Sequence, residues 1–178
     1  MSGVAGASST AGGGFRVGLG FDVHPFSDDP SRPCILGGVV LGAERGLAGH
    51  SDADVVAHAV ADAVLGATGL GDIGQHFPDT DPAWQGADSL GLLAEVVRRA
   101  AAAGWRVVNA DCTVVAERPR VAPARPEMIE ALSAAAGAPV HVKATRPEGL
   151  GALGRAEGIA CLAVALVEQL PPGSEESP

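Results

Sequence analysis

The chain lacks tyrosine altogether, and its few aromatic residues make up only 3% of 178 residues. Because single-stranded nucleic acids stack on aromatic side chains, the sequence offers few platforms for them. Basic residues are also outnumbered, with 12 Lys and Arg against 21 Asp and Glu, which gives a net charge of −9. A nucleic-acid backbone is bound through basic patches. We therefore expect no nucleic-acid partner and a core built from Ala, Val and Leu.

Cysteine and long apolar runs are scarce as well. The three cysteines, Cys34, Cys112 and Cys161, are far apart and include no Cys-x-x-Cys pair, which excludes a disulfide framework and a thiolate zinc site. We predict that they are small buried hydrophobic residues. The longest apolar run, 159–167, is far shorter than the roughly 20 residues of a membrane helix, and residues 1–14 lack the pattern of a signal peptide. These absences predict a cytoplasmic protein with no membrane partner.

The acidic residues are concentrated in one part of the chain. Residues 46–94 contain no Lys, Arg or Glu, but they contain seven aspartates. A solvated helix face normally uses the longer Glu, Lys and Arg, so short aspartates indicate side chains held in a fixed geometry. Nine of the 12 bases lie between Arg98 and Arg155. The sequence thus separates an acidic segment from a more basic one.

Hydrophobic periodicity predicts an α/β (α+β) fold. The expected strands span 15–23, 35–41 and 106–116. Residues 140–144 form a shorter strand candidate, and 159–167 has a pattern that a strand and a buried helix share. The expected helices span 52–68, with Ser51 as N-cap, 89–103 and 126–136. We predict one domain over residues 15–170, with a mixed four- to five-stranded sheet covered by helices. The tails, 1–14 and 171–178, are predicted to be disordered.

One set of residues has the composition of a metal site. Asp22 and His24 end the first strand and share a face, and His58 on the first helix could join them. Two His and one carboxylate form a catalytic zinc pattern with an open fourth position. Asp54, His58 and Asp62 are spaced i, i+4, i+8, so Asp62 could orient an imidazole. The alternative is that this stripe is the solvent face of an amphipathic helix.

Two loops carry further candidate chemistry. Residues 71–82 are rich in turn formers but include Ile73 and Phe77, which a plain surface loop has little reason to contain. Residues 143–157 follow a candidate strand and combine glycines, a hydroxyl and arginines, a composition suited to phosphate. A plain surface loop and a glycine-rich turn remain the respective alternatives.

Several motifs resemble those of one enzyme family, in order, from about Phe15 to Val167. They are Phe21-Asp-Val-His24, Ala48-Gly-His-Ser-Asp-Ala-Asp-Val-Val-Ala-His58, Gly69-Leu-Gly-Asp-Ile-Gly74, Phe77-Pro-Asp-Thr-Asp-Pro82 and Gly158-Ile-Ala-Cys161. The chain closely resembles the 2-C-methyl-D-erythritol 2,4-cyclodiphosphate synthase family of the non-mevalonate isoprenoid pathway. The resemblance implies a homotrimer with active sites between subunits. It also implies conversion of 4-diphosphocytidyl-2-C-methyl-D-erythritol 2-phosphate to the cyclic diphosphate and CMP, a phosphorus-oxygen lyase reaction.

The resemblance also implies roles for individual residues. The zinc ligands would be Asp22, His24 and His58, and Glu148 would bind Mg²⁺ or Mn²⁺ on the diphosphate. The catalytic candidates are His50, Asp62 and Arg146. The substrate contacts would be His50 and Ser51 at phosphate, with Asp72, Ile73, Gly74, Phe77, Pro78, Asp79, Thr80 and Asp81 at methylerythritol, and Ala116, Pro119, Arg120, Val121, Ala122 and Thr145 toward the cytidine side. Lys143 and Arg155 are further substrate-binding candidates.

The chain departs from the family's motifs at residues that would touch substrate. Arg146 and Pro147 stand where the family usually has threonines, and Ala156 stands where it usually has glycine. An arginine could still hold a phosphate, with a different reach. Two alternatives therefore stay open: a zinc-dependent hydrolase of nucleotide diphosphates, and a non-catalytic nucleotide-binding trimer.

Overall fold

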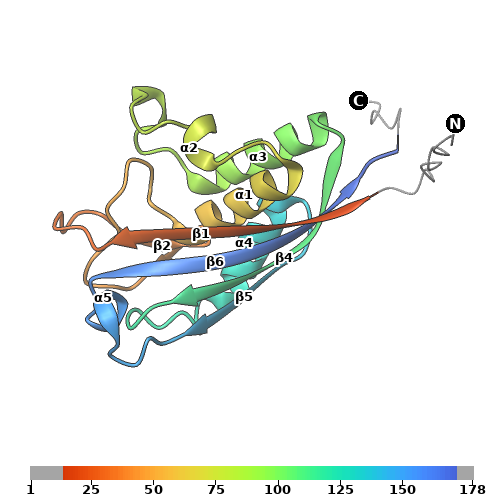
Figure 1. Ribbon diagram of the computed structural model, residues 1–178. Coiled ribbons are helices and arrows are strands. Elements are labelled where there is room, and N and C mark those ends of the chain that lie inside the picture. Colours follow the sequence, from red (N-terminus) through yellow and green to blue (C-terminus); the bar gives the residue numbers. More distant parts are fainter. Residues whose placement is uncertain (1–13, 172–178) are drawn as a thin grey trace, which may run out of the picture.

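A computed structural model describes residues 14–171 of the chain (Figure 1). Its strands are β1 (Phe15–Pro25), β2 (Cys34–Leu36), β3 (Val39–Leu41), β4 (Trp105–Val115), β5 (Val140–Thr145) and β6 (Gly158–Gln169). Its helices are α1 (Val55–Thr68), α2 (Ile73–His76), α3 (Ser89–Ala102), α4 (Arg125–Ala136) and α5 (Gly151–Gly154), with a 3₁₀ turn η1 (Pro82–Trp84). The long elements lie where the hydrophobic patterns predict them, so the α/β fold is confirmed.

Four strands form one mixed sheet in the order β1-β6-β4-β5. β6 pairs antiparallel with β1 and with β4, whereas β4 and β5 run parallel and are connected through α4. Figure 1 shows α1, α3 and α4 on one face of this sheet, while none of these helices lies on the other face. The predicted mixed sheet is thus confirmed, with β1 and β5 as its outer strands.

Two glycines of β1 let the sheet approach α1 closely. A Cβ at Gly18 would lie 1.9 Å from the carbonyl oxygen of Ala63, and a Cβ at Gly20 would lie 1.9 Å from that of Ala59. Both distances are too short for a carbon atom, so no larger residue fits without moving the helix. Asp22 and His24 follow on the same face of β1 and therefore point toward α1.

The single strand predicted over 35–41 is wrong. The segment forms a hairpin instead, with β2 and β3 paired as a separate two-stranded sheet. Gly37 and Gly38 make the turn with φ values of 57° and 76°, a conformation that glycine adopts without steric cost. The Gly-Gly pair is the sequence signal for this turn, but the β-branched residues on both sides of it favoured the prediction of one continuous strand.

The predicted start of α1 is also wrong. Asp54, not Ser51, is the N-cap, and its carboxylate accepts hydrogen bonds from the N–H groups of Val56 and Ala57. It also accepts from Gly37 and Gly38, at 2.9 and 2.6 Å, and its side chain is fully buried. Asp54 therefore fixes the hairpin to the helix and does not belong to a solvent-exposed stripe.

The loops predicted to be irregular contain short regular pieces. α2 and η1 lie within 71–82, and α5 lies within 143–157. Phe77 is only 7% exposed and contacts the core, so this loop is more than a plain surface loop. The three cysteines are buried and free, as predicted. Within residues 14–171, no helix is long and apolar enough to cross a membrane. Residues 1–13 and 172–178, most of the predicted tails, lie outside the described residues.

Candidate metal centre and active site

Three side chains from β1 and α1 converge on one point. Asp22 Oδ2 lies 2.9 Å from His24 Nε2 and 3.0 Å from His58 Nδ1, and the two nitrogens are 3.3 Å apart. The close approach of β1 to α1 at Gly18 and Gly20 brings His58 within reach of the strand. Among residues 14–171, these three are the single group of His, Cys, Asp and Glu side chains close enough to hold a metal.

The spacing of these atoms fits a tetrahedral zinc ion. Nitrogen and oxygen ligands about 2.0–2.1 Å from tetrahedral zinc lie about 3.3 Å from one another. The three observed separations are close to that value, and none of the three side chains is fully buried. Two imidazoles with one carboxylate leave a fourth position for a water or a substrate oxygen. The donor set therefore suits a catalytic zinc site.

A backbone carbonyl fixes the ring of His24. His24 Nδ1 lies 2.8 Å from the oxygen of Ala48, so Nδ1 carries the proton and donates it, which leaves the Nε2 lone pair facing the cluster. Burial alone would lower the pKa of His24, but the Asp22 carboxylate reverses this and holds that pKa above its ordinary value. Conversely, burial would raise the pKa of Asp22, but its interactions with the adjacent imidazoles of His24 and His58 bring that pKa below its ordinary value.

The far side of the His58 ring faces two hydroxyl groups. Its Nε2 lies 2.9 Å from Ser89 Oγ and 3.2 Å from Ser51 Oγ. Ser89 in turn donates a short hydrogen bond to the carboxylate of Asp52. Sequence analysis singled out neither Ser89 nor this role of Asp52, because the contact between His58 and Ser89 joins residues 31 positions apart. Only the folded chain shows it.

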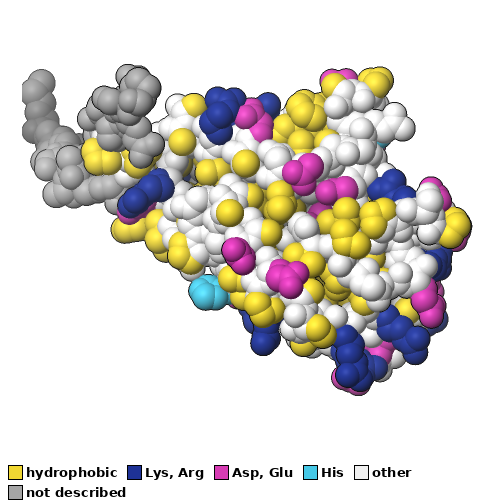
Figure 2. All heavy atoms as spheres, turned by 180° about the vertical axis from the view of Figure 1, so that it is seen from behind, with side chains coloured by type: hydrophobic (Ala, Val, Ile, Leu, Met, Phe, Trp, Pro, Cys, Tyr) yellow, Lys and Arg dark blue, Asp and Glu magenta, His cyan; other side chains and the backbone are white. Residues whose placement is uncertain are grey.

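A recess in the surface lies away from Asp22, His24 and His58. It has a volume of about 1270 Å³ and lies between the β2–β3 hairpin and the segments that follow β4 and β5. Arg45, Arg118, Arg120, Arg146 and Arg155 line it together with Glu44, Glu117 and Glu127. Figure 2 shows Lys and Arg side chains, interspersed with acidic ones, at the end of the molecule away from the grey termini. The recess therefore has a net excess of positive charge.

Comparison with known proteins identifies the family. Residues 15–168 match the YgbB family. The chain is 56% identical over 154 residues to the 2-C-methyl-D-erythritol 2,4-cyclodiphosphate synthase of Symbiobacterium thermophilum, covering 85% of this chain and 97% of that one. The chain belongs to the YgbB family.

Solved structures agree with this assignment. The bifunctional IspDF from Campylobacter jejuni matches with a TM-score of 0.85 and 37% identity, over 90% of this chain and 44% of that longer one. A CDP complex of IspF from Plasmodium falciparum matches with a TM-score of 0.75 and 28% identity, over 88% of this chain and 97% of that one. That Plasmodium falciparum IspF is thus known with CDP bound.

The structure separates the predicted metal ligands. Asp22, His24 and His58 come together, but Glu148 follows β5 and lies outside the cluster. β1 and β5 are the outer strands with two strands between them, and a strand spacing of about 4.8 Å puts them about 14 Å apart. The two predicted metal positions are therefore separate within one chain of this family.

Asp62 has a different contact from the one predicted. Its Oδ1 accepts a hydrogen bond of 2.7 Å from the N–H of Ile73, at the start of α2. Burial raises the pKa of Asp62, against the effect of that N–H, and the nearby Asp72 charge adds to the rise. The prediction that Asp62 orients an imidazole is wrong in this structure, because Ala48 and Ser89 occupy the outward ring nitrogens.

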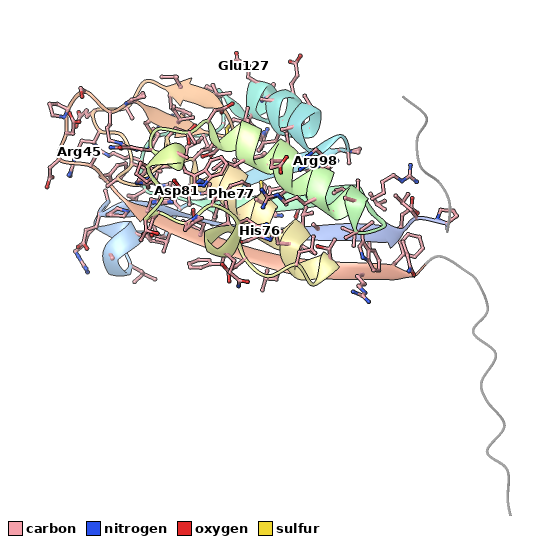
Figure 3. The ribbon with its side chains drawn as sticks, turned by 90° about the horizontal axis from the view of Figure 1, so that it is seen from above. Arg45, His76, Phe77, Asp81, Arg98 and Glu127 are labelled. Carbon is pink, nitrogen blue, oxygen red and sulfur yellow. The ribbon has the colours of Figure 1, made fainter. Side chains whose placement is uncertain are left out.

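The predicted methylerythritol loop is fastened to α3. His76 Nδ1 lies 2.6 Å from Arg99 Nη1, and its Nε2 lies 2.8 Å from the carbonyl oxygen of Leu70. The Phe77 ring packs edge-on against Trp84, with centroids 4.9 Å apart, and Arg99 lies over its face. In Figure 3, His76 and Phe77 lie side by side on the helical side of the sheet. This loop is an ordered unit.

The remaining residues of this loop differ in exposure. Asp72 caps α2 and Asp81 caps η1 through their carboxylates. Gly74, Asp79 and Thr80 are exposed, and Pro78 is half-buried. His50 Nε2 lies 3.2 Å from the carbonyl oxygen of Asp81, so the loop reaches the segment before α1.

That segment is held by a side chain that sequence analysis did not single out. The guanidinium of Arg32 donates to the carbonyl oxygens of Gly49 and Ser51, at 3.0 and 2.7 Å. Ser51 itself is 7% exposed, and its hydroxyl faces His58 and the N–H of Ala53. The Ser51 side chain therefore lies behind the three converging side chains, beside the outward nitrogen of the His58 ring.

The remaining predicted catalytic and substrate residues lie in several environments. Pro119, Arg120, Arg146 and Arg155 line the recess, whereas the side chains of Ala116 and Val121 are buried in the core and Ala122 is exposed. Thr145 is exposed at the end of β5, and Lys143 pairs with Asp111 on the neighbouring strand. Arg146 pairs with Glu117, which holds the pKa of that carboxyl below its ordinary value.

Proposed function

We propose that this chain converts 4-diphosphocytidyl-2-C-methyl-D-erythritol 2-phosphate into 2-C-methyl-D-erythritol 2,4-cyclodiphosphate and CMP. The observation that carries the proposal is the convergence of Asp22, His24 and His58 in a chain 56% identical to a relative with that synthase name. In the reaction, an oxygen of the 2-phosphate forms a bond to the β-phosphorus. The bond from that phosphorus to the bridging oxygen of CMP breaks, so CMP leaves with the electron pair, and the enzyme is a phosphorus-oxygen lyase.

The side chains of the cluster are suited to hold Zn²⁺. One carboxylate and two neutral imidazoles leave a bound Zn²⁺ with a net positive charge, which attracts a phosphate oxygen. The bound ion would supply Lewis-acid polarisation of that oxygen. The Ala48 carbonyl keeps the lone pair of His24 Nε2 directed into the cluster, so the ligands need little rearrangement to bind.

The rest of the site positions the substrate. We assign the methylerythritol part to the loop from Asp72 to Asp81, and the contacts of Arg99 with His76 and Phe77, which keep this loop ordered, support the assignment. The arginines of the recess are suited to the phosphates of the cytidine nucleotide, as pairs of N–H groups match phosphate oxygens. No residue has to act as a nucleophile, because the attacking oxygen belongs to the substrate. Holding that oxygen in line with the leaving group is the main contribution of the protein.

We further propose a homotrimer in which neighbouring subunits complete each site. The face of the sheet opposite α1, α3 and α4 exposes large apolar side chains in adjacent strands, namely Phe15, Val17, Leu19, Phe21, Val23, Leu162 and Val164. Contiguous apolar patches of this kind mark interaction surfaces. Within one chain the zinc ligands and Glu148 lie on opposite edges of the sheet. In a trimer, Glu148 of a neighbouring subunit would hold Mg²⁺ or Mn²⁺ on the diphosphate.

Three buried, free cysteines fit a reducing compartment, which supports a cytoplasmic location.

Arg146 stands where the family that this chain resembles usually has a threonine. Because Glu117 already binds its guanidinium, we assign Arg146 to shaping the nucleotide recess, with contact to phosphate only after that ion pair opens.

Phosphorus NMR on the purified protein with zinc, magnesium and substrate tests the reaction. We expect the signals of a cyclic diphosphate and of CMP in equal amounts. Linear phosphates without the cyclic product would identify a zinc-dependent nucleotide-diphosphate hydrolase instead. Substrate signals that shift but do not convert would identify a nucleotide-binding trimer without activity. Either result would overturn the proposed synthase.

A further inference from the structure

The His58 ring has a close polar contact at each of its two nitrogens, one toward Asp22 and His24 and one on the opposite side. Nδ1 lies 3.0 Å from Asp22 Oδ2, on the cluster side. Nε2 lies 2.9 Å from Ser89 Oγ, on the opposite side. An imidazole that binds a metal through one nitrogen carries its proton on the other, so Nε2 needs an acceptor. Ser89 supplies the shorter of the two hydroxyl contacts at this nitrogen.

The hydroxyl proton of Ser89 has one strong acceptor. Ser89 Oγ donates to Asp52 Oδ1, and the backbone N–H of Ser89 donates to Asp52 Oδ2 at 3.2 Å. A carboxylate accepts only, and a serine has one proton to give, so the Ser89 oxygen accepts from His58 Nε2–H. The chain of bonds thus has one direction: His58 donates to Ser89, and Ser89 donates to Asp52. This direction leaves the lone pair on Nδ1.

Capping of α3 does not account for the Ser89 side chain. The N-cap of α3 is Asp88, whose carboxylate accepts from the N–H of Leu90. Ser89 is the first residue of the helix, is 1% exposed, and points its hydroxyl toward α1. A buried polar group in that position needs partners, and its three partners, Asp52, His58 and Ser51, all belong to the region of the metal site. Its role therefore concerns His58.

Ser51 is placed less favourably for the same role. Its oxygen is 3.2 Å from His58 Nε2 and already accepts the N–H of Ala53 at 3.1 Å. Among residues 14–171, no carboxylate lies within hydrogen-bond distance of its hydroxyl, and the oxygen of Ser89 is 3.4 Å away. The charge of Asp52 reaches His58 through Ser89, which makes Ser51 a matched control within the same pocket.

We propose that Ser89 and Asp52 are positioning residues for the metal site, which hold the His58 imidazole in the tautomer and orientation that bind Zn²⁺ through Nδ1. This inference rests on the proposed zinc site. Partners of this kind behind a metal-binding histidine typically change metal affinity by roughly 10- to 100-fold. The effect concerns the affinity for the metal alone and does not require substrate or turnover.

Competition of the intact protein with a chromogenic chelator for Zn²⁺ tests the proposal. We expect Ser89→Ala to weaken zinc binding roughly 10- to 100-fold, and Ser51→Ala to change it by less than about threefold. Circular dichroism and the unfolding temperature of the zinc-free variants establish that each is folded. Equal losses in both serine variants, or wild-type affinity in Ser89→Ala, would overturn the proposal.

A second variant covers the case in which Ser89→Ala does not fold. Asp52→Asn keeps the shape of the side chain and an oxygen acceptor but removes the charge, so we expect a smaller loss of zinc affinity in the same direction. In the double variant with Ser89→Ala, the Asn substitution should add little, because both changes break one chain of bonds. Unchanged zinc binding in Asp52→Asn would count against the proposal.

The outcomes also separate this inference from the proposed reaction. Tight zinc binding that falls in Ser89→Ala, without cyclic product in phosphorus NMR, would support the positioning role and overturn the synthase. Cyclic product together with unchanged zinc affinity in Ser89→Ala would do the reverse. A wild-type protein that binds no zinc would overturn both.

Discussion

At the scale of single residues, the imidazole of His58 joins two different environments. Its Nδ1 faces Asp22 and His24, and its Nε2 faces Ser51 and Ser89. A histidine at such a junction contributes a ligand to the metal and also determines how that ligand is directed. Replacing it removes one of three donors, whereas the surrounding core is left in place because the side chain is partly exposed.

We predict that His58→Ala abolishes zinc binding and turnover while the protein stays folded. Two ligands from one strand bind zinc far more weakly than three, and the lost side chain contacts mainly polar groups. Metal analysis after dialysis should fall from one zinc per chain to none, with an unchanged circular-dichroism spectrum. His141→Ala, at an exposed histidine of β5, should keep the metal. Full activity of a metal-stripped His58→Ala protein would rule out the zinc mechanism.

A second prediction at this scale concerns the ion pair between Arg146 and Glu117. The guanidinium lowers the pKa of the Glu117 carboxyl, so the carboxylate form is favoured in the folded protein. We predict that Arg146→Thr raises that pKa toward its ordinary value. A carboxyl whose folded pKa is lowered stabilises the folded state above its unfolded pKa and loses this contribution as the pH falls.

Side-chain carboxyl NMR over an acid titration measures this change, and Glu95 provides an internal control. Arg98 and Arg99 hold the pKa of Glu95 at about 2, and neither contact involves the nucleotide recess. Its midpoint should therefore stay where it is in Arg146→Thr. An unchanged midpoint for Glu117 would show that the ion pair does not persist in solution.

At the scale of elements, the contact between β1 and α1 decides where the site can form. Gly18 and Gly20 bring the strand against the helix backbone, and the next two inward residues of the strand are the ligands Asp22 and His24. The helix then places His58 beside Asp22 and His24. Displacing this contact would therefore change both stability and metal geometry.

We predict that Gly20→Ala destabilises the protein by about 3 kcal/mol, because the new methyl group overlaps the helix backbone, which cannot move aside as a side chain can. Its Cβ would lie 1.9 Å from the carbonyl oxygen of Ala59 and 2.7 Å from the N–H nitrogen of Ala63. Urea unfolding of the zinc-free protein measures the loss. A free energy of unfolding equal to that of the wild type would contradict the close approach.

The opposite result is expected at Gly66, on the same helix. A Cβ there would have a single neighbour, the carbonyl oxygen of Leu19 at 3.8 Å, which is ordinary contact. Glycine inside a helix costs about 0.5–1 kcal/mol relative to alanine. We therefore predict that Gly66→Ala raises the free energy of unfolding by about that amount in the same urea experiment. A loss of stability would mean that α1 and β1 are closer than the structure places them.

At the scale of the whole molecule, one face of the sheet is covered by helices and the other exposes apolar side chains. Leu19 is 66% exposed at the middle of β1, and Leu162 and Val164 lie beside it on β6. The proposed trimer buries this face and brings the zinc ligands of one subunit near the nucleotide recess of another. In this proposal, activity depends on assembly of the trimer, whereas zinc binding does not, because all three zinc ligands belong to one chain.

We predict that Leu19→Lys converts the trimer to monomers and reduces turnover strongly while zinc remains bound. A charge cannot be buried at an apolar interface without a partner. Light scattering after size-exclusion chromatography measures the mass, and metal analysis measures the zinc. Ala94→Lys, on the exposed surface of α3, is the control and should leave the mass unchanged. A wild-type protein that is monomeric and fully active would contradict the shared site.

The sequence by itself determined the elements whose signal is local. The long strands and helices follow from periodicity, and the packing of Phe77 follows from an apolar residue in a loop of turn formers. The cluster of Asp22, His24 and His58 could be predicted, because strand alternation and helical spacing aim side chains in known directions. The nucleotide segment was predicted from the family resemblance, and the structure places four of its residues in one recess.

Only the tertiary structure decided what depends on contacts between distant segments. Asp54 looked like part of a ligand stripe, but the hairpin at Gly37 and Gly38 buries it as a helix cap. Asp62 looked like the support for an imidazole, yet Ser89 and Ala48 take that place because α3 and the segment before α1 lie closer. Spacing along a chain limits which face a residue occupies. The packing of the other elements determines what that face meets.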